Sequence, residues 1–287
     1  MKKLKAAPTL QDTRSRAITA ITRDHGDHLV TRSDNRITRA LSRPPGLVVY
    51  ITCGDPDLKT SREIILAAVR AGAHVIEMGV PFSDPVADGP VIQRASERAL
   101  RNNTSLQDVL NLAGEIRKES DAGLVIFTYL NPILRFGMER FCLETARAGA
   151  DGALVTDLTV EEAGDYRRLM AEHKLDTIFL AAPTSPDQRL KAIAAACKGF
   201  IYAVSRTGVT GTQKQLAGDA RELVKRIRKF SKLPVAVGFG ISNAEQFAQV
   251  GEFADAGAVG SAVVQAIEQN PGSEASAVAE MVRSLRG

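Results

Sequence analysis

The 287-residue sequence contains few of the residue types that build metal centres, disulfide frameworks or nucleic-acid-binding surfaces. It has no tryptophan, 5% aromatic residues, three cysteines and four histidines. Cys53, Cys142 and Cys197 are far apart, and neither they nor the histidines have the spacing of zinc ligands or of a CxxC pair. Isolated cysteines of this kind are typical of a reducing compartment, so we expect a cytoplasmic protein with no disulfide and no bound metal.

Long apolar runs are also absent from the sequence. No segment approaches the roughly 20 apolar residues that a membrane-spanning helix requires, so we expect no membrane association. The basic start of the chain, MKKLK, is not followed by the apolar stretch of a secretory signal. The acidic residues Asp12, Asp24 and Asp27 argue against an organellar transit peptide.

The net charge of +4 is concentrated near the N-terminus. Residues 1–44 hold ten Lys or Arg and four Asp, which leaves 27 basic and 29 acidic residues in the rest of the chain. That remainder has no basic stripe with interleaved aromatic residues, so we expect no nucleic-acid partner. Residues 1–34 are polar, basic and without strong periodicity, which predicts a disordered extension ahead of one folded domain over 35–287.

Eight short apolar runs rich in β-branched residues recur along the folded part of the chain. They span residues 47–52, 74–80, 123–130, 152–158, 177–182, 200–205, 234–240 and 257–264. Most are apolar throughout, which is typical of parallel strands buried on both faces. Amphipathic helical patterns lie between and after them, over 61–71, 105–119, 137–148, 161–173, 187–197, 218–230, 243–252 and 275–286. Helix-start signals occur at Thr60, Thr159 and Ser185.

Strands that alternate with helices in this way predict an α/β fold, a single (β/α)8 barrel of the TIM type. A short helix around residues 35–42 is predicted to close the bottom of the barrel. A doubly wound open sheet is the alternative. No GxGxxG motif follows the first strand, which weakens the dinucleotide-binding form of that alternative.

Glu77 interrupts the apolar strand HVIEMGV. A carboxyl group that is buried there without a partner has a raised pKa, which suits it to proton transfer. The alternative is a structural glutamate paired with a basic group. Because a charge within a barrel strand is costly to bury, we favour a functional role.

The loop after this strand, PFSDPVADGP (81–90), is held in a defined shape by its prolines and Gly89. Active sites of such barrels form at the carboxyl ends of the strands, so Asp84 and Asp88 are expected on the active face. Asp88 precedes Gly-Pro, however, and its side chain is equally suited to capping a helix that begins near Pro90.

Three glycine-bearing segments lie at the last three strands: 207–211 after the sixth, 238–242 at the seventh and 260–261 at the eighth. Glycine lets backbone N–H groups approach a phosphate, and a helix beginning at Ser261 would direct its positive end toward one. Barrel phosphate sites commonly use the last two of these positions. The alternative is that the glycines only permit tight turns. The segment 205–215 also combines glycine with polar residues, as in a lid that orders over substrate, although an ordinary surface loop fits equally.

At these residues the sequence resembles the α subunits of tryptophan synthase, over residues 35–287. The shared motifs are YITCGDP (50–56), EMGVPFSDPVADGP (77–90), SRTGVTG (205–211), GFGIS (238–242) and Gly260-Ser261. The PFSDPVADGP block is the most specific of them. Two departures stand out: Tyr50 lies where the family often has phenylalanine, and Thr159 lies where it commonly has proline, which leaves that loop less rigid.

The resemblance implies cleavage of indole-3-glycerol phosphate to indole and glyceraldehyde 3-phosphate, in tryptophan biosynthesis. Glu77 and Asp88 match the catalytic residues. The positions that match the substrate site are Tyr50, Phe127, Leu180, Tyr202 and the lid residue Thr210, and the phosphate binders are Gly211, Gly240, Gly260 and Ser261. The resemblance implies no cofactor in this subunit. It also implies a separate β subunit that carries pyridoxal phosphate, in an α2β2 complex.

The implied reaction, a retro-aldol cleavage, accounts for the two carboxyl groups. Indole C3 must gain a proton, positive charge then develops on the ring nitrogen, and Asp88 would stabilise that charge. Glu77 would take the proton of the glycerol hydroxyl group, and it is also placed to protonate C3. The same residues also fit a stand-alone lyase. A barrel that only activates a partner and a different phosphosugar enzyme are the remaining alternatives.

Overall fold

The structure is a computed structural model that describes residues 35–204, 213–238 and 240–287, with residues 213–217 described for their backbone only. Residues 1–34, predicted to form a disordered extension, lie outside the described part of the chain. So does most of the predicted lid. No helix within the described ranges is long and apolar enough to cross a membrane.

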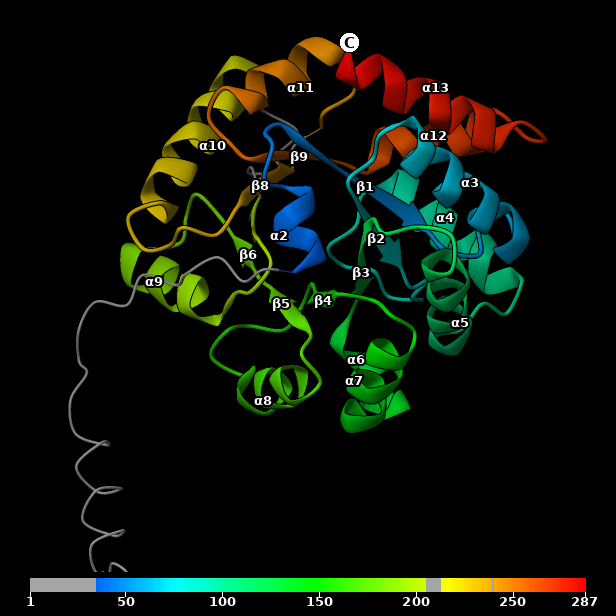
Figure 1. The fold of residues 1–287 in the computed structure, drawn as a ribbon, viewed down its shortest axis with the longest axis horizontal. Helices are drawn as coiled ribbons and strands as arrows, with labels where there is room; N and C mark the ends of the chain where they lie inside the picture. Colours follow the sequence, from blue (N-terminus) through cyan, green and yellow to red (C-terminus); the bar gives the residue numbers. More distant parts are fainter. Residues whose placement is uncertain (1–34, 205–212, 239) are drawn as a thin grey trace, which may run out of the picture.

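Nine parallel strands form one continuous sheet with the order β5-β4-β3-β2-β1-β9-β8-β7-β6 (Figure 1). Their bounds are β1 (Gly46–Thr52), β2 (Val75–Gly79), β3 (Gly123–Thr128), β4 (Gly152–Val155), β5 (Asp176–Ile178), β6 (Leu180–Ala181), β7 (Ile201–Val204), β8 (Val235–Gly238) and β9 (Ala256–Val259). Only Phe179 separates β5 from β6, so these two strands occupy one position of the ring. The ring therefore has eight strand positions, and the predicted (β/α)8 barrel is confirmed.

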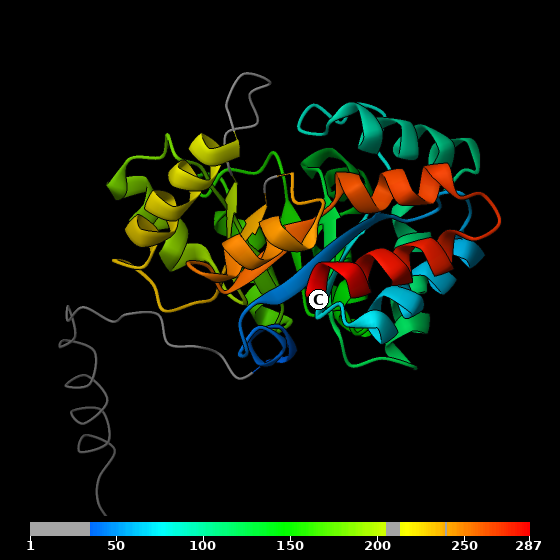
Figure 2. The same ribbon diagram turned by 90° about the horizontal axis from the view of Figure 1, so that it is seen from above.

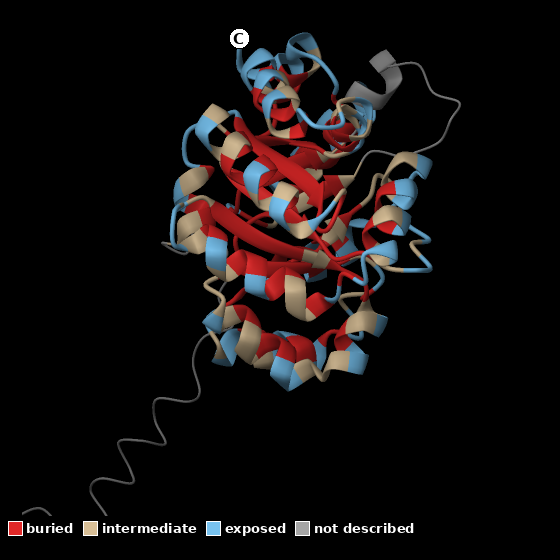
Figure 3. Ribbon diagram, turned by 90° about the vertical axis from the view of Figure 1, so that its right-hand side faces the viewer, coloured by how far each residue is buried: buried red, intermediate tan, exposed pale blue. Residues whose placement is uncertain are grey.

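Helices surround the ring, with their exposed faces turned to solvent and the buried strands inside (Figures 2 and 3). The surrounding helices are α3 (Leu58–Ala71), α4 (Pro90–Arg101), α5 (Leu106–Arg117), α6 (Leu130–Phe136), α7 (Met138–Arg147), α8 (Gly164–Glu172), α9 (Asp187–Ala196), α10 (Gln213–Ile227), α11 (Ala244–Gly251), α12 (Ser261–Gln269) and α13 (Glu274–Arg286), and α2 (Arg36–Ala40) lies at one end of the ring. The connections after β2, β3 and β9 each hold two helices. Helix α12 begins almost directly at the end of β9, whereas α4 begins at Pro90, after the loop over residues 80–89.

Side chains of each strand alternate between the helix layer and the barrel interior. In β1, Val49 and Ile51 pack in the large cluster beneath the helices, whereas Val48 belongs to a separate cluster inside the barrel. Ile37 and Leu41, at α2 and directly after it, are fully buried in that inner cluster. Helix α2 lies over the centre of the ring (Figure 1). The predicted helix that closes the barrel bottom is therefore present.

Three predicted boundaries are wrong for local reasons. The run 257–264 is not one strand, because β9 ends at Val259 and α12 begins at Ser261, after the break at Gly260. The first outer helix begins before Thr60, because Asp57 is its cap and accepts the Thr60 N–H at 2.8 Å. The Thr159 hydroxyl donates to Glu162 at 2.9 Å within a turn, and the helix begins only at Gly164.

Candidate active site

The interior of the barrel carries polar and aromatic side chains above its apolar floor. Glu77 of β2 lies in register with Tyr50 of β1 and Val125 of β3. Leu180 of β6 lies in register with Tyr202 of β7, and both pack against the inner cluster. These side chains share the interior because each lies two positions after a residue of the inner cluster: Val48, Val75, Ile178 and Phe200.

Glu77 is 1% exposed, and its Oε1 atom has no hydrogen-bond partner. No ion pair to its carboxyl group occurs within the described residues, so the structural alternative, a glutamate held by a basic group, has no support there. Burial raises the pKa of Glu77 to about 8. Glu77 is therefore mainly protonated at neutral pH.

Asp88 lies in the loop between β2 and α4, and this loop fixes it through its backbone. Its N–H donates to the carbonyl of Pro85 at 3.0 Å, and its carbonyl accepts from Gln93 Nε2 at 2.8 Å. Helix α4 is capped by Gly89 with Pro90 in its first turn, and no side chain makes a cap hydrogen bond. The carboxylate of Asp88 therefore does not cap this helix.

Tyr129, which the sequence analysis did not single out, holds the Asp88 loop from the end of β3. It is 3% exposed, its hydroxyl accepts the N–H of Ala87 at 3.0 Å, and its ring lies 5.1 Å from that of Phe82. Burial raises the pKa of Asp88 to about 6, and a hydrogen bond with Tyr129 opposes that rise. The signal in the sequence was an aromatic residue at the carboxyl end of a strand.

Two tyrosines and Phe127 form an aromatic wall in the interior. The rings of Tyr50 and Phe127 lie 5.0 Å apart in an edge-on arrangement. The Tyr50 hydroxyl accepts a hydrogen bond from Thr52 Oγ1 at 3.4 Å, which gives this buried group a partner. Any side chain at Gly79 would collide with the Tyr50 ring, and one at Gly238 would collide with Tyr202. The absence of a side chain at both positions is what admits the two rings.

Both carboxyl groups act electrostatically on the tyrosines of this wall. Burial is the main cause that raises the pKa values of Tyr50 and Tyr202. The charge of Glu77 raises both further, and the charge of Asp88 acts on Tyr50 as well. The two predicted catalytic residues therefore act on one apolar, aromatic space.

Helix α12 starts next to the aromatic wall and offers backbone N–H groups. Gly260 is its N-cap, and no side chain caps its first turn, which begins at the exposed Ser261. A β-carbon at Gly260 would lie 3.5 Å from that of Tyr50. Gly240 has φ +43° and nothing within 4 Å of a built β-carbon, so the space beside it is open. These are the features of an anion site at a helix N-terminus.

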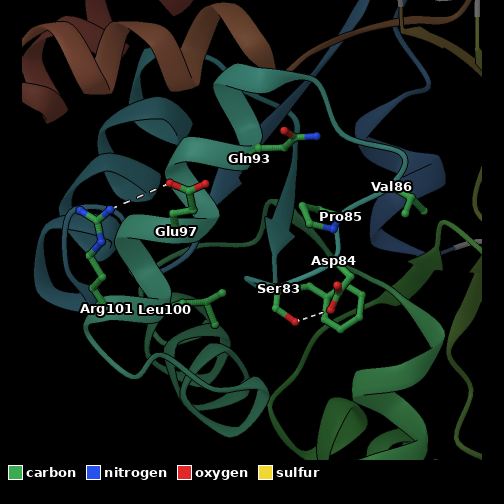
Figure 4. A pocket seen from close by; sticks show the side chains of 9 residues that line it. Ser83, Asp84, Pro85, Val86, Gln93, Glu97, Leu100 and Arg101 are labelled. Atoms are coloured by element: carbon green, nitrogen blue, oxygen red, sulfur yellow. Dashed lines mark hydrogen bonds and ion pairs between the residues drawn. The ribbon is translucent and has the colours of Figure 1, made fainter.

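Two predicted site residues, Thr210 and Gly211, lie outside the described residues. Asp84 lines a cavity of 660 Å³ between the loop that follows β2 and helix α4 (Figure 4). Its carboxylate accepts a hydrogen bond from Ser83 at 2.6 Å. Neither Glu77 nor Asp88 lines this cavity.

The family model described as "Tryptophan synthase alpha chain" matches residues 39–286. The chain belongs to this family. The tryptophan synthase alpha chain of Solibacter usitatus is 51% identical over 229 residues, which cover 80% of this chain and 86% of that protein. The alpha chain of Neisseria meningitidis serogroup B is 44% identical over 248 residues, 86% of this chain and 95% of that one.

Solved structures agree with the sequence relatives. Tryptophan synthase subunit alpha from Legionella pneumophila superposes with a TM-score of 0.81 at 36% identity, and covers 88% of this chain and 98% of that one. A chain of tryptophan synthase from M. tuberculosis superposes with a TM-score of 0.79 at 35% identity, and the match covers 89% of this chain and 100% of that one. This chain is therefore a lyase of the tryptophan synthase alpha type, a TIM barrel of tryptophan biosynthesis.

Proposed function

We propose that this chain cleaves indole-3-glycerol phosphate to indole and glyceraldehyde 3-phosphate with Glu77 and Asp88 as its catalytic residues. The observation that carries the proposal is Glu77, a buried carboxyl group with an unpartnered oxygen inside an aromatic-lined barrel. A carboxyl group in this environment is costly unless it has a chemical task. Family membership supports the reaction, and the geometry supports these two residues.

Asp88 is assigned to the indole nitrogen. With a pKa of about 6 it is mainly ionised at neutral pH. When C3 of the ring gains a proton, positive charge spreads to the ring nitrogen, and the carboxylate stabilises that charge through the N–H group. The backbone contacts to Pro85 and Gln93 fix the carboxylate before the substrate binds, so little reorganisation is needed during the reaction.

Glu77 is assigned to both proton transfers. Its protonated form donates to C3, which breaks the aromaticity of the ring. The carboxylate so formed then takes the proton from the glycerol hydroxyl group as the carbon–carbon bond breaks, and the electron pair of that bond restores the indole ring. One proton moves from oxygen to carbon through Glu77, and Glu77 returns to its starting state.

The two ends of the substrate are assigned to different parts of the barrel mouth. The flat indole ring lies against Tyr50, Phe127, Leu180 and Tyr202. The phosphate lies at the first turn of α12, bound by Gly240, Gly260 and Ser261. The resemblance adds Thr210, as the lid residue, to the substrate contacts and Gly211 to the phosphate contacts. We assign no cofactor to this chain, and place pyridoxal phosphate in the β partner.

Purified protein incubated with indole-3-glycerol phosphate should release indole, and Glu77→Gln should reduce that release by about 10³-fold. Binding of glycerol 3-phosphate should persist, because the anion site is formed by α12. The matched control is Glu245→Gln, on the surface of α11. Loss of folding or of glycerol 3-phosphate binding in Glu77→Gln would show that Glu77 has a structural role instead.

We further propose a tryptophan synthase β subunit as the partner, in an α2β2 complex. The two most exposed large apolar side chains among the described residues are Val86 and Leu134, at 85% and 57% exposure. Val86 lines the cavity of Figure 4, and Leu134 lies close to Asn131 and Pro132 on α6. Exposed apolar groups beside a cavity are typical of a protein interface.

Mixing with a β subunit should raise the rate of indole release. High release from the chain alone, with no further rise, would favour an independent lyase.

Three buried free cysteines fit the reducing cytoplasm in which we place the complex. We assign catalysis to residues 35–287 and place residues 1–34 outside the catalytic domain.

A further inference from the structure

The two helices that begin at the proposed substrate site are joined by ion pairs to Glu268, near the C-terminal end of α12. Helix α4 begins two residues after Asp88, and α12 begins at Ser261, where the phosphate is proposed to bind. The two helices lie side by side (Figure 1). Arg98 of α4 connects them both to the loop that follows β1.

The guanidinium group of Arg98 contacts two carboxylates from distant parts of the chain. Its Nε and Nη2 atoms donate to the two carboxylate oxygens of Asp55, at 2.7 and 2.8 Å. Its Nη1 atom donates to Oε1 of Glu268 on α12 at 2.7 Å. Arg94 adds a two-pronged contact to the same Glu268 at 2.8 and 2.7 Å. One side chain therefore links the β1–α3 loop, α4 and α12.

The network is rigid at its centre. The Asp55 side chain is 2% exposed, and those of Arg98 and Glu268 are 28% and 26% exposed. A planar guanidinium that meets a carboxylate with two parallel hydrogen bonds fixes orientation as well as distance. Hydrogen bonds from Arg94 and Arg98 lower the pKa of Glu268 to about 2, so Glu268 is ionised at neutral pH.

The linked positions lie at similar depths along the two helices. At 1.5 Å per residue, Arg98 is about 12 Å from Pro90, and Glu268 is about 10 Å from Ser261. Between these depths and the barrel mouth, Ala95 of α4 and Val264 of α12 pack with Tyr50. The ion pairs to Glu268 and the shared packing on Tyr50 hold the two helices together at two points along their axes, so neither helix can shift without the other. The network therefore fixes the spacing of their first turns.

We propose that Arg98 is a positioning residue that sets the distance between Asp88 and the phosphate-binding end of α12. The inference rests on the proposed function, since the substrate carries an indole ring at one end and a phosphate at the other. Both ends must be bound at once for the reacting atoms to meet Glu77. A displacement of about 1 Å far from the chemistry costs about 10²-fold in rate.

The test compares a ligand that spans both ends of the site with ligands that occupy one end. Glu268→Ala cuts the link to α12 but leaves the Arg98–Asp55 pair, the most buried part of the network, intact. We expect kcat/KM for indole-3-glycerol phosphate to fall at least tenfold. The affinities for glycerol 3-phosphate alone and for indole alone should change less than twofold, because each probe uses one end only.

Arg98→Lys is the second variant, because lysine keeps the charge beside Asp55 and loses the planar fork. This variant should also lower kcat/KM for indole-3-glycerol phosphate and leave the affinities for glycerol 3-phosphate alone and for indole alone nearly unchanged. The double variant Arg98→Lys/Glu268→Ala should lose less kcat/KM than the product of the two single fold reductions, because both substitutions break the same link. The matched control is Glu252→Ala, which removes an ion pair of 2.7 Å to Arg221 at the protein surface and should leave all three ligands unaffected.

Two results would overturn the inference. Equal weakening of all three ligands in Glu268→Ala would mean that the network serves the fold in general, and unchanged kinetics would mean that it has no role in spacing. If the wild type releases indole normally and either result is obtained, the inference about Arg98 is rejected and the proposed function stands. Absence of release from folded wild-type protein would reject the proposed function and, with it, this inference.

Discussion

At the scale of single residues, the two carboxyl groups differ because their surroundings differ. Glu77 is enclosed and has an unpartnered oxygen, so burial raises its pKa to about 8. Asp88 is half-buried and has a hydrogen bond with Tyr129, so its pKa rises only to about 6. Between these values Asp88 is ionised and Glu77 is protonated, which is the pair of states that the proposed mechanism requires.

The dependence of kcat/KM on pH should therefore be bell-shaped. Activity should rise with pH as Asp88 loses its proton near pH 6, and fall as Glu77 loses its proton near pH 8. The two limbs belong to the coupled pair rather than to isolated groups. Initial rates of indole release at low substrate concentration measure this profile, and a flat profile from about pH 5 to pH 9 would contradict the assignments.

Stability should depend on Glu77 in the same pH range. The folded-state pKa of about 8 lies above the ordinary value of 4.5, so the folded protein holds a proton that the unfolded chain has lost. The contribution of this bound proton to the free energy of unfolding is complete below about pH 4 and is lost as the pH rises through 8. Urea denaturation of Glu77→Gln should show a weaker loss of stability between pH 5 and pH 9 than the wild type, and parallel curves would contradict this.

Tyr129→Phe removes the hydroxyl group that contacts Asp88 and Ala87. Without that hydrogen bond the pKa of Asp88 should rise, so the acidic limb of the profile should move to higher pH. We expect kcat/KM at neutral pH to fall by about tenfold, since the loop also loses the bond from Ala87. Tyr166→Phe, at a buried tyrosine of α8 remote from Asp88, is the control. An unshifted acidic limb would show that Tyr129 does not act on Asp88.

At the scale of elements, α2 has a structural role that is separable from catalysis. Leu41 is fully buried beneath the barrel, so Leu41→Ala should lower the free energy of unfolding by about 2–5 kcal/mol. KM should stay unchanged, because the bottom of the barrel is remote from the strand ends that bind substrate. Leu134→Ala, at an exposed position, should cost less than about 0.5 kcal/mol. Equal losses in chemical denaturation would show that α2 does not close the core.

The elements themselves were predictable where one pattern dominated. Continuous apolar runs revealed β1 and β4 because both faces of each strand are buried. The run 257–264 misled because its second half is apolar for a different reason: Val263 and Val264 are buried residues of α12. Periodicity over four residues cannot separate these cases. Helix α6 was hidden for the same reason, since Tyr129 and Leu130 extend the apolar run of β3.

The site was predictable only where chemistry contradicted its surroundings. Glu77 stood out as a carboxylate in an apolar strand, and the PFSDPVADGP block marked Asp88. Tyr129 did not stand out, because an aromatic residue in an apolar run is ordinary. The partners of Arg98 lie 43 and 170 residues away in sequence, and no local pattern relates them. Such contacts become visible only when the barrel closes.

At the scale of the whole molecule, the proposed partner surface can be tested without altering the interior. Leu134→Asp places a charge on the exposed side of α6. The variant alone should release indole within about twofold of the wild-type rate, while activation by a β subunit should fall at least tenfold, because an unpaired charge is costly in an interface. The control is Leu134→Met. Full activation of Leu134→Asp would place the interface elsewhere.

The pairing of each tyrosine with a glycine also has a consequence for redesign. The Tyr50 ring fills the space that a side chain at Gly79 would need, and Tyr202 does the same above Gly238. Shortening either tyrosine would therefore open room for a bulkier aromatic ligand without a second change. A larger residue at either glycine would be accepted only after its tyrosine had been shortened. An evolving or engineered version of this barrel can thus widen its pocket in one mutational step, but must narrow it in two, in a fixed order.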